Sequence, residues 1–308
     1  MKKYLDLIFS LIISITTYQF YPVWIQGLGP EYLRSVAYST EERPYVYRVL
    51  LPLLSRFLES VTNISAVYFL VFLFIVCAVI LYFSLKYLYT SFRDDERAGI
   101  VAFLICEILF VILLSFPHVY DLPAAMFFTL SLALIARGKH LTYLLLFPIA
   151  TLNRETTFLL TIVWLVVSFR KISYAYLLFG AAYQGIAYLG IRTAITTAFA
   201  NSPGQTLDWQ PMYNLTRYIN APLSTTLLLA FLALIWYAAT KRWNDKPLFL
   251  RTAFLILFPL QIILHVSLGG AFEIRVYAES LPLAGLLIMW KSTTSINADL
   301  PERGRARL

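Results

Sequence analysis

Residues 64–88 read ISAVYFLVFLFIVCAVILYFSLKYL, and this stretch decides the fold class of the chain. Its one charged side chain, Lys86, lies near its end. A helix rises about 1.5 Å per residue, so about 20 apolar residues cross the roughly 30 Å of hydrocarbon in a bilayer. The stretch is long enough and apolar enough for that, and it therefore predicts a helix that spans a membrane.

The composition extends this prediction to the whole chain. Of its 308 residues, 59% are hydrophobic and 14% are charged, and the mean hydropathy is +0.70. Soluble domains average about 45–50% apolar and about 25% charged residues. We therefore expect an all-α, polytopic transmembrane bundle in which residues 1–308 form one transmembrane domain of about ten spans. Besides 64–88, the expected spans are 4–20, 98–116, 123–136, 141–152, 156–169, 172–190, 223–240, 249–268 and 277–290.

The distribution of positive charge predicts the orientation. With the N-terminus inside, 17 of the 25 Lys and Arg residues fall in inner segments, and every outer cation is an arginine. This agrees with the positive-inside rule. It also accounts for the net charge of +8 without nucleic acid as a partner. We expect a multi-pass protein of the cell (inner) membrane, with both termini cytoplasmic and residues 291–308 forming a cytoplasmic tail.

Two large outer loops are expected. The first, 21–63, contains the short apolar segment 45–58, in which Arg48, Ser55, Arg56 and Glu59 form one stripe of a helix. Because a span here would reverse every later loop, we expect an amphipathic helix lying in the outer membrane interface. The second outer loop, 191–222, contains Ser-Pro-Gly and Gln-Pro turn signals.

The outer connection at His118, Tyr120 and Asp121 offers a first candidate site. A carboxylate next to a histidine at the membrane boundary is a candidate general base. The alternative is structural: Asp121 lies two residues before Pro123, an arrangement typical of a helix N-terminus that an Asp side chain caps.

Two more outer connections carry ionisable residues beside very apolar helices. Arg154 and Glu155 follow a short apolar run, and ionisable groups at such depth favour a functional site. The alternative is a local Arg–Glu pair that closes a helical hairpin. Glu273 and Arg275 precede the last span, where an acidic residue also favours the helix dipole.

No metal site is predicted, because the sequence lacks the Cys/His spacing of a zinc site. It also lacks a phosphate-binding glycine loop and a nucleophile elbow. Glu107 lies inside an apolar run and keeps open a transporter or lipid flippase with an ion relay. A non-catalytic membrane scaffold is the other alternative. An enzyme is favoured over a transporter, because the charges lie mostly at the boundary and no internal repeat is evident. It is favoured over a scaffold, because a scaffold would not need a polar cluster shared by distant loops.

The chain resembles the GT-C class of integral membrane glycosyltransferases. The features that carry the resemblance are Tyr45–Pro52 (YVYRVLLP) in the first outer segment, Tyr120-Asp121, Asn153–Thr156 (NRET) and Glu273-Ile274-Arg275. The resemblance covers most of the chain as architecture. The chain departs from the class in two respects. Its first outer loop has no Asp, where the class usually has a catalytic one, and it lacks a large C-terminal periplasmic domain.

The resemblance implies a transferase of the cell envelope that moves a hexose or pentose from a polyprenyl-phosphate donor to a glycan, lipid or protein acceptor at the outer face. It implies no certain cofactor, and it leaves a divalent metal open without identifying a site. A carboxylate must deprotonate the acceptor hydroxyl, and cations must stabilise the leaving phosphate. We expect Asp121 as the base, with Glu41 or Glu42 as alternatives. The expected substrate-binding residues are Arg48, Arg154, Arg275, Glu155, Glu273, His118 and Tyr120.

Overall fold

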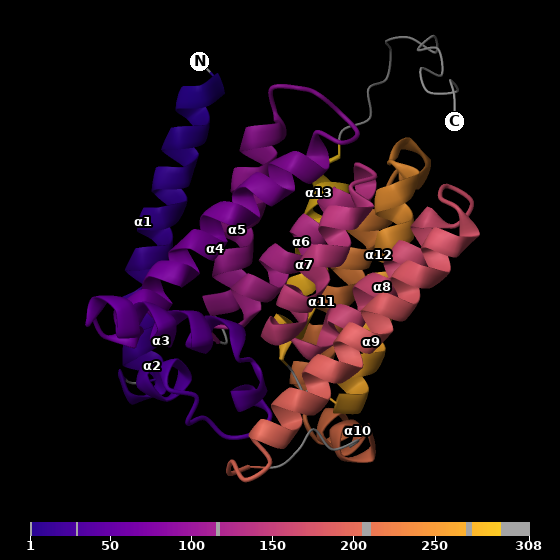
Figure 1. The fold of residues 1–308 in the computed structure, drawn as a ribbon. Helices are drawn as coiled ribbons and strands as arrows, with labels where there is room; N and C mark the ends of the chain where they lie inside the picture. Colours follow the sequence, from indigo (N-terminus) through magenta and orange to yellow (C-terminus); the bar gives the residue numbers. More distant parts are fainter. Residues whose placement is uncertain (1, 29, 115–117, 205–210, 269–272, 291–308) are drawn as a thin grey trace.

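The computed structural model describes residues 2–28, 30–114, 118–204, 211–268 and 273–290 (Figure 1). These residues are helical or lie in connections, and the one β contact among them is an isolated bridge between Arg43 and Gly204. The predicted all-α fold is confirmed. The long helices are α1 (Lys2–Leu28), α4 (Ala66–Tyr89), α5 (Ala98–Leu114), α6 (Asp121–Ala136), α7 (His140–Asn153), α8 (Phe158–Ser168), α9 (Tyr174–Ala198), α11 (Pro222–Thr240), α12 (Leu248–Leu268) and α13 (Leu281–Met289).

Shorter helices connect the long ones. They are α2 (Pro30–Ala37), α3 (Leu50–Thr62) and α10 (Pro211–Asn220), together with the 3-10 turns η1 (Tyr45–Tyr47), η2 (Glu155–Thr157), η3 (Trp243–Asp245) and η4 (Ile274–Glu279). Every apolar stretch that the sequence marks as a span is helical over most of its described part.

Three described helices are long and apolar enough to cross a membrane, which is consistent with a membrane protein. They are Ala66–Tyr89, Pro222–Thr240 and Leu248–Ser267. Shorter apolar helical stretches, between 10 and 17 residues long, are Tyr4–Gln19 within α1, Ala98–Leu113, Asp121–Ala136, His140–Asn153 and Glu155–Ser168. The expected number of about ten spans stays a prediction.

Helix α6 forms the centre of the bundle and packs most extensively against α4. Nearly every residue of α6 is buried, including its first residue, Asp121. Alanines such as Ala125 and Ala133, both fully buried, let the helices on either side approach closely. The helix that carries Asp121 is therefore rigidly held, and its first turn lies at a fixed place in the bundle.

Helices α2, α3 and α10 lie at one end of the bundle, the lower end in Figure 1, which we call the site end. At the opposite end Lys86 of α4 pairs with Asp6 of α1 at 2.5 Å, and the rings of Tyr89 and Trp290 lie 5.3 Å apart. The start of α1 and the end of α13 therefore share one end of the molecule. The cytoplasmic location of both termini stays a prediction.

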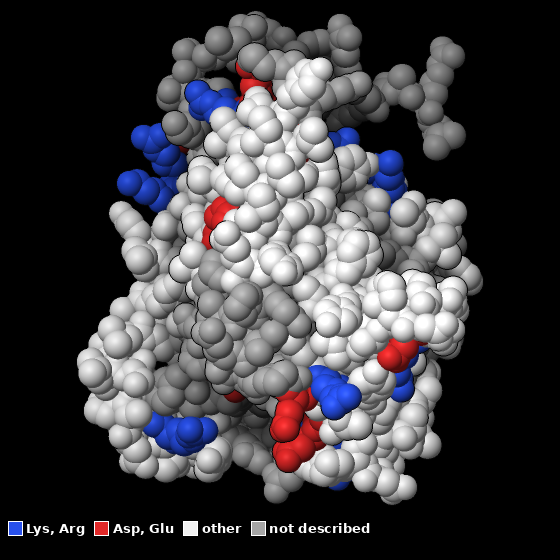
Figure 2. Space-filling model, turned by 90° about the vertical axis from the view of Figure 1, so that its left-hand side faces the viewer, with Lys and Arg blue, Asp and Glu red and all other residues white. Residues whose placement is uncertain are grey.

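The surface is charged mainly toward its two ends. Figure 2 shows acidic and basic side chains gathered at the top and bottom of one face, with a mostly uncharged band between them. Large apolar side chains that are more than half exposed lie on many of the long helices, including Leu11, Phe72, Leu145, Leu178 and Leu227. Such a surface is suited to lipid rather than to water.

The two expected outer loops are more helical than predicted. Helix α1 continues to Leu28, so the first loop begins later than residue 21, and the expected helix 45–58 is divided into η1 and α3. Arg48 lies between these two elements, so the stripe it was expected to form with Ser55, Arg56 and Glu59 does not exist. In the segment 191–222, α9 extends to Ala198 and α10 occupies Pro211–Asn220. The expected tail, 291–308, lies outside the described residues.

The two loop regions contact each other directly. The Arg43 backbone N–H donates to the Pro203 carbonyl at 2.8 Å, and the Arg43 guanidinium donates to the Gly204 carbonyl at 2.7 Å. Gly204 has a φ of +90°, and a Cβ there would lie 2.8 Å from the Arg43 carbonyl oxygen. A glycine is needed at this position because both the conformation and the close approach exclude a side chain.

Candidate functional site

Three connections at the site end bring buried charges together. They are the segment before α6, the η2 turn between α7 and α8, and the η4 turn before α13. Asp121 Oδ1 lies 2.9 Å from Arg154 Nη1, and Asp121 Oδ2 lies 3.5 Å from Arg275 Nη1. Arg154 Nε lies 3.0 Å from Glu279 Oε1. Asp121, Arg154, Arg275 and Glu279 thus form one ionic cluster.

Burial makes this cluster costly to assemble. Asp121 is fully buried, and Arg154, Arg275 and Glu279 are 4% exposed or less. Separating charges from water is unfavourable unless partners and hydrogen bonds compensate it. Glu279 has them, because it also accepts hydrogen bonds from Thr156 and from Gln261, the latter at 2.7 Å.

The structure shows neither of the two local roles that were the structural alternatives for Asp121 and Arg154. Asp121 is not the cap of α6: it is the first helical residue, Tyr120 occupies the cap position, and no side-chain cap hydrogen bond forms. Arg154 makes its ion pairs with Asp121 and Glu279 rather than with its neighbour Glu155. Each of these residues therefore serves to join distant segments.

A second group surrounds Arg48. Arg48 Nη2 lies 3.8 Å from Glu155 Oε1, and Arg192 Nη1 lies 3.9 Å from Glu155 Oε2. Burial raises the pKa of Glu155, but Arg48 and Arg192 outweigh it, so the pKa lies below its ordinary value. The Arg48 guanidinium lies over the rings of Tyr45 and Tyr120, 5.3 Å from each centroid, within the range of a cation–π contact.

Tyr120 connects Glu41 to this group, because the Tyr120 hydroxyl donates a hydrogen bond to Glu41 Oε2. Glu41 is 7% exposed, and burial raises its pKa to about 7, against the lowering effects of Tyr120 and Arg48. A carboxylate with such a pKa can take up and release a proton near neutral pH. Its neighbour Glu42 is exposed and has no place in the cluster.

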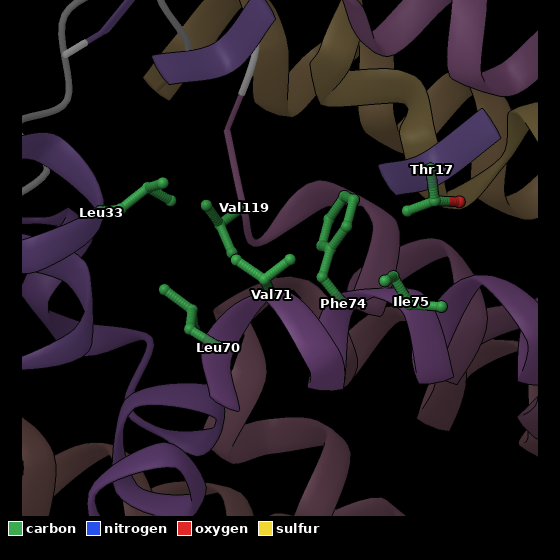
Figure 3. Close-up of a pocket in the computed structure, with 7 residues that line it drawn as sticks. All are labelled: Thr17, Leu33, Leu70, Val71, Phe74, Ile75 and Val119. Atoms are coloured by element: carbon green, nitrogen blue, oxygen red, sulfur yellow. The ribbon is translucent and has the colours of Figure 1, made fainter. Parts of the chain in front are cut away.

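His118 is held as a neutral ring. Its imidazole stacks on Tyr45 with centroids 5.1 Å apart, and Tyr32 Oη lies 3.1 Å from its Nδ1. Burial, followed by the positive charge of Arg275, lowers the His118 pKa to about 3. The apolar wall behind this segment is shown in Figure 3, where Val119 faces a small pocket with Leu33 and Phe74.

Several buried polar atoms of the cluster have no hydrogen-bond partner among the described residues. They are Nε and Nη1 of Arg48, both amide atoms of Asn153, and Oε1 of Gln261. Four further atoms lack a hydrogen-bond partner but lie in ion pairs: Asp121 Oδ2, Arg154 Nε, Glu155 Oε2 and Arg192 Nη1. Asn153 is 1% exposed and Arg48 is 6% exposed. Buried polar atoms are nearly always paired, so a concentration of unpaired ones marks the place of a polar ligand or of water. The unpaired donors of Arg48 are suited to an anion.

Most of the predicted site residues lie together in the structure, and two lie at the edge of the site or outside it. The structure brings together Arg48, Asp121, Arg154, Glu155 and Arg275 with Glu41, His118 and Tyr120. Glu273 reaches the edge through Arg275 at 2.8 Å, and Glu42 stays outside. Sequence reasoning gave no role to Arg192, Asn153 or Gln261. Asn153 lies within the NRET segment, while nothing in the local sequence distinguishes Arg192 or Gln261.

The described residues include no group of three or more His, Cys, Asp or Glu side chains placed to hold a metal ion. No protein-family model, no curated protein and no solved structure matches this chain. The site geometry therefore carries the functional argument alone.

Proposed function

We propose that this chain is a GT-C-class membrane glycosyltransferase that uses a polyprenyl-phosphate-linked sugar as donor. The observation that carries the proposal is the pair of unpaired, buried donor nitrogens on Arg48, which lie beside a carboxylate of near-neutral pKa, Glu41. The Arg48 nitrogens are suited to a phosphate oxygen, since a guanidinium binds phosphate with charge-assisted hydrogen bonds. The Glu41 carboxylate is suited to the role of general base.

The roles follow from which groups are already occupied. Asp121 is shared by Arg154 and Arg275, and Arg154 is also paired with Glu279. These four residues hold the framework of the site, and releasing any of them would leave a buried charge uncompensated. Arg48 keeps free donors, so it takes the phosphate, and Glu41 takes the acceptor proton in place of Asp121.

The reaction is a single displacement. Glu41 removes the proton from the acceptor hydroxyl, and the acceptor oxygen forms a bond to the anomeric carbon of the sugar. The bond between that carbon and the phosphate oxygen breaks, and its electron pair leaves on the polyprenyl phosphate. The added negative charge is stabilised by Arg48. The products are the glycosylated acceptor, polyprenyl phosphate and a protonated Glu41.

An apolar groove is compatible with a lipid-linked donor. It measures about 190 Å³ and lies between α5, α11 and α13, with Ile105, Phe231, Leu281, Gly285 and Ile288 among its lining residues. Leu281 is two residues beyond Glu279, so the groove starts next to the ionic cluster and follows α13 away from it. In the proposed orientation the site end is the outer face, with about ten spans and both termini cytoplasmic.

The test is sugar transfer by purified protein in detergent, from a panel of polyprenyl-phosphate sugars. We expect transfer by the natural chain, loss of turnover with unchanged donor binding in Glu41→Gln, and full activity in the matched control Glu42→Gln. Full activity in Glu41→Gln would remove that residue as base. A chain that transfers no sugar but drives substrate flux in liposomes would be a transporter, and the proposal would be wrong.

A further inference from the structure

Helix α10 exposes its apolar side chains and turns polar ones toward the protein. Met212, Leu215 and Ile219 are 72%, 47% and 68% exposed. Their spacing of three and four residues places them in one stripe along the helix. A helix on the surface of a soluble protein buries such a stripe, so this one faces something other than water.

The contacts of α10 with the protein include hydrogen bonds from the side chains of its inner face. The buried Asn214 side chain donates through Nδ2 to the Val266 carbonyl of α12 at 3.0 Å, and Tyr218 Oη lies 3.4 Å from His265 Nε2. Asn214 and Tyr218 are four residues apart and so lie on the same face. The helix is thus fixed to α12 by hydrogen bonds, which leaves its apolar stripe available.

A third face of α10 is polar and exposed. It carries Thr216, Arg217 and Asn220, together with Tyr213, which is 57% exposed and whose ring centroid lies 5.7 Å from the Arg217 guanidinium. At 3.6 residues per turn, the apolar stripe lies between this polar face and the protein-facing side. That order is typical of a helix lying in the plane of a membrane surface, with one side in the acyl chains and another in water.

The adjoining helix indicates what covers the apolar stripe. Only Ala221 separates α10 from α11, one of the helices that could cross a membrane. The apolar surface continues across this junction, since Leu223 and Leu227 of α11 are 73% and 63% exposed. A surface that runs without a break into a membrane-crossing helix meets the same lipid.

We infer that α10 lies in the boundary between headgroups and acyl chains at the site end of the bundle. Met212, Leu215 and Ile219 enter the acyl layer, and Arg217 lies among the lipid phosphates. The helix is also connected to the ionic cluster, because His265 Nδ1 lies 2.8 Å from Tyr277 Oη in the η4 turn. This inference does not depend on the proposed activity.

Single-cysteine variants labelled with an environment-sensitive fluorophore test the inference in the full chain. The native Cys77 and Cys106 are buried and are replaced by alanine in all variants. Leu215→Cys and Ile219→Cys report on the apolar stripe, and Arg217→Cys and Asn220→Cys are the matched controls on the same helix. Each is reconstituted into phosphatidylcholine vesicles with or without bromine on the acyl chains.

We expect blue-shifted emission and several-fold stronger quenching by brominated chains at 215 and 219 than at 217 and 220. Equal quenching at all four positions would overturn the inference. Blue-shifted emission at 215 and 219 without quenching would also overturn it, because a protein surface rather than lipid would then cover the stripe. Transfer activity is not measured, so failure of the proposed function leaves this result intact.

Discussion

Arg154 Nη1 lies 2.9 Å from Asp121 Oδ1, although 33 residues separate the two side chains in the sequence. The contact joins the first turn of α6 to the connection between α7 and α8. Both residues are buried, and Arg275 and Glu279 extend the contact to the start of α13. The pair therefore fixes three helices relative to one another at the site end, which makes it a structural requirement of any site there.

Replacement of Asp121 by Asn should destabilise the fold. It leaves Arg154 and Arg275 without their shared counter-charge, and removal of one partner of a buried ion pair costs about 3–5 kcal/mol. Thermal unfolding in detergent should show a lowered midpoint. The control is Glu273→Gln, whose carboxylate is 26% exposed and pairs with Arg275, and which should change stability by roughly 0–1 kcal/mol. Equal losses in both variants would contradict the structural role of Asp121.

The activity should depend on pH through Glu41. Because its pKa in the folded chain is about 7, the base is protonated and inactive below that pH, and the rate should rise with pH to half its maximum near 7. Tyr120 donates a hydrogen bond that lowers this pKa. Tyr120→Phe should therefore move the half-maximum to higher pH. An unchanged profile in that variant would speak against Glu41 as the titrating group.

The same pKa predicts a stability change. The folded chain keeps the Glu41 proton up to a pH of about 7, while the unfolded chain loses it near the ordinary carboxyl value of 4.5. Between these values the folded state binds more protons, so stability should fall as pH rises through that window. Unfolding midpoints measured across it should show a smaller fall for Glu41→Gln than for the natural chain.

Arg48→Lys should weaken donor binding while the chain still folds. Lysine keeps the charge next to Glu155 but loses the planar fork, and loss of one charge-assisted hydrogen bond corresponds to roughly tenfold weaker binding. Binding of a polyprenyl-phosphate sugar is the measurement. Arg56→Lys, on α3, changes the same residue type away from the cluster and should bind as the natural chain does. Unaltered binding in Arg48→Lys would exclude Arg48 as the phosphate ligand.

Gly204→Ala should loosen the contact between the two loop regions. The φ of +90° and the 2.8 Å approach to the Arg43 carbonyl oppose any side chain, and strain of this kind costs about 1–3 kcal/mol. The matched control is Gly185→Ala within α9, where a Cβ meets nothing within 4 Å and the helix gains about 0.5–1 kcal/mol. Unfolding midpoints should move in opposite directions in the two variants, and movement in the same direction would contradict the strain argument.

The proposed orientation can be tested with Asn201→Cys and Lys241→Cys, both at exposed positions. Asn201 lies in the segment that docks on the first loop, at the site end, and Lys241 follows α11. A membrane-impermeant thiol reagent added to intact cells should label the first variant and spare the second. The reverse pattern would overturn the inside–outside assignment and the outer location of the site.

The sequence by itself determined the fold class and the placement of the helices. Runs such as 64–88 and 223–240 are helical in the structure almost to the residue, because apolar length depends on local sequence alone. It also selected Arg48, Asp121, Arg154 and Arg275, since ionisable residues next to long apolar runs are rare and costly. Loop structure was less predictable: α10 and the break between η1 and α3 follow from contacts with other segments.

Only the tertiary structure decided the partners of these side chains, on which the proposed roles rest. Asp121, expected as the base, forms ion pairs with Arg154 and Arg275, whereas Glu41 is buried beside Tyr120 with its pKa raised to about 7. A pKa and an ion pair depend on burial and on charges within a few ångströms, and these come from segments tens to hundreds of residues away. The local sequence gives the side chain, and the packing of the helices gives the environment that determines its chemistry.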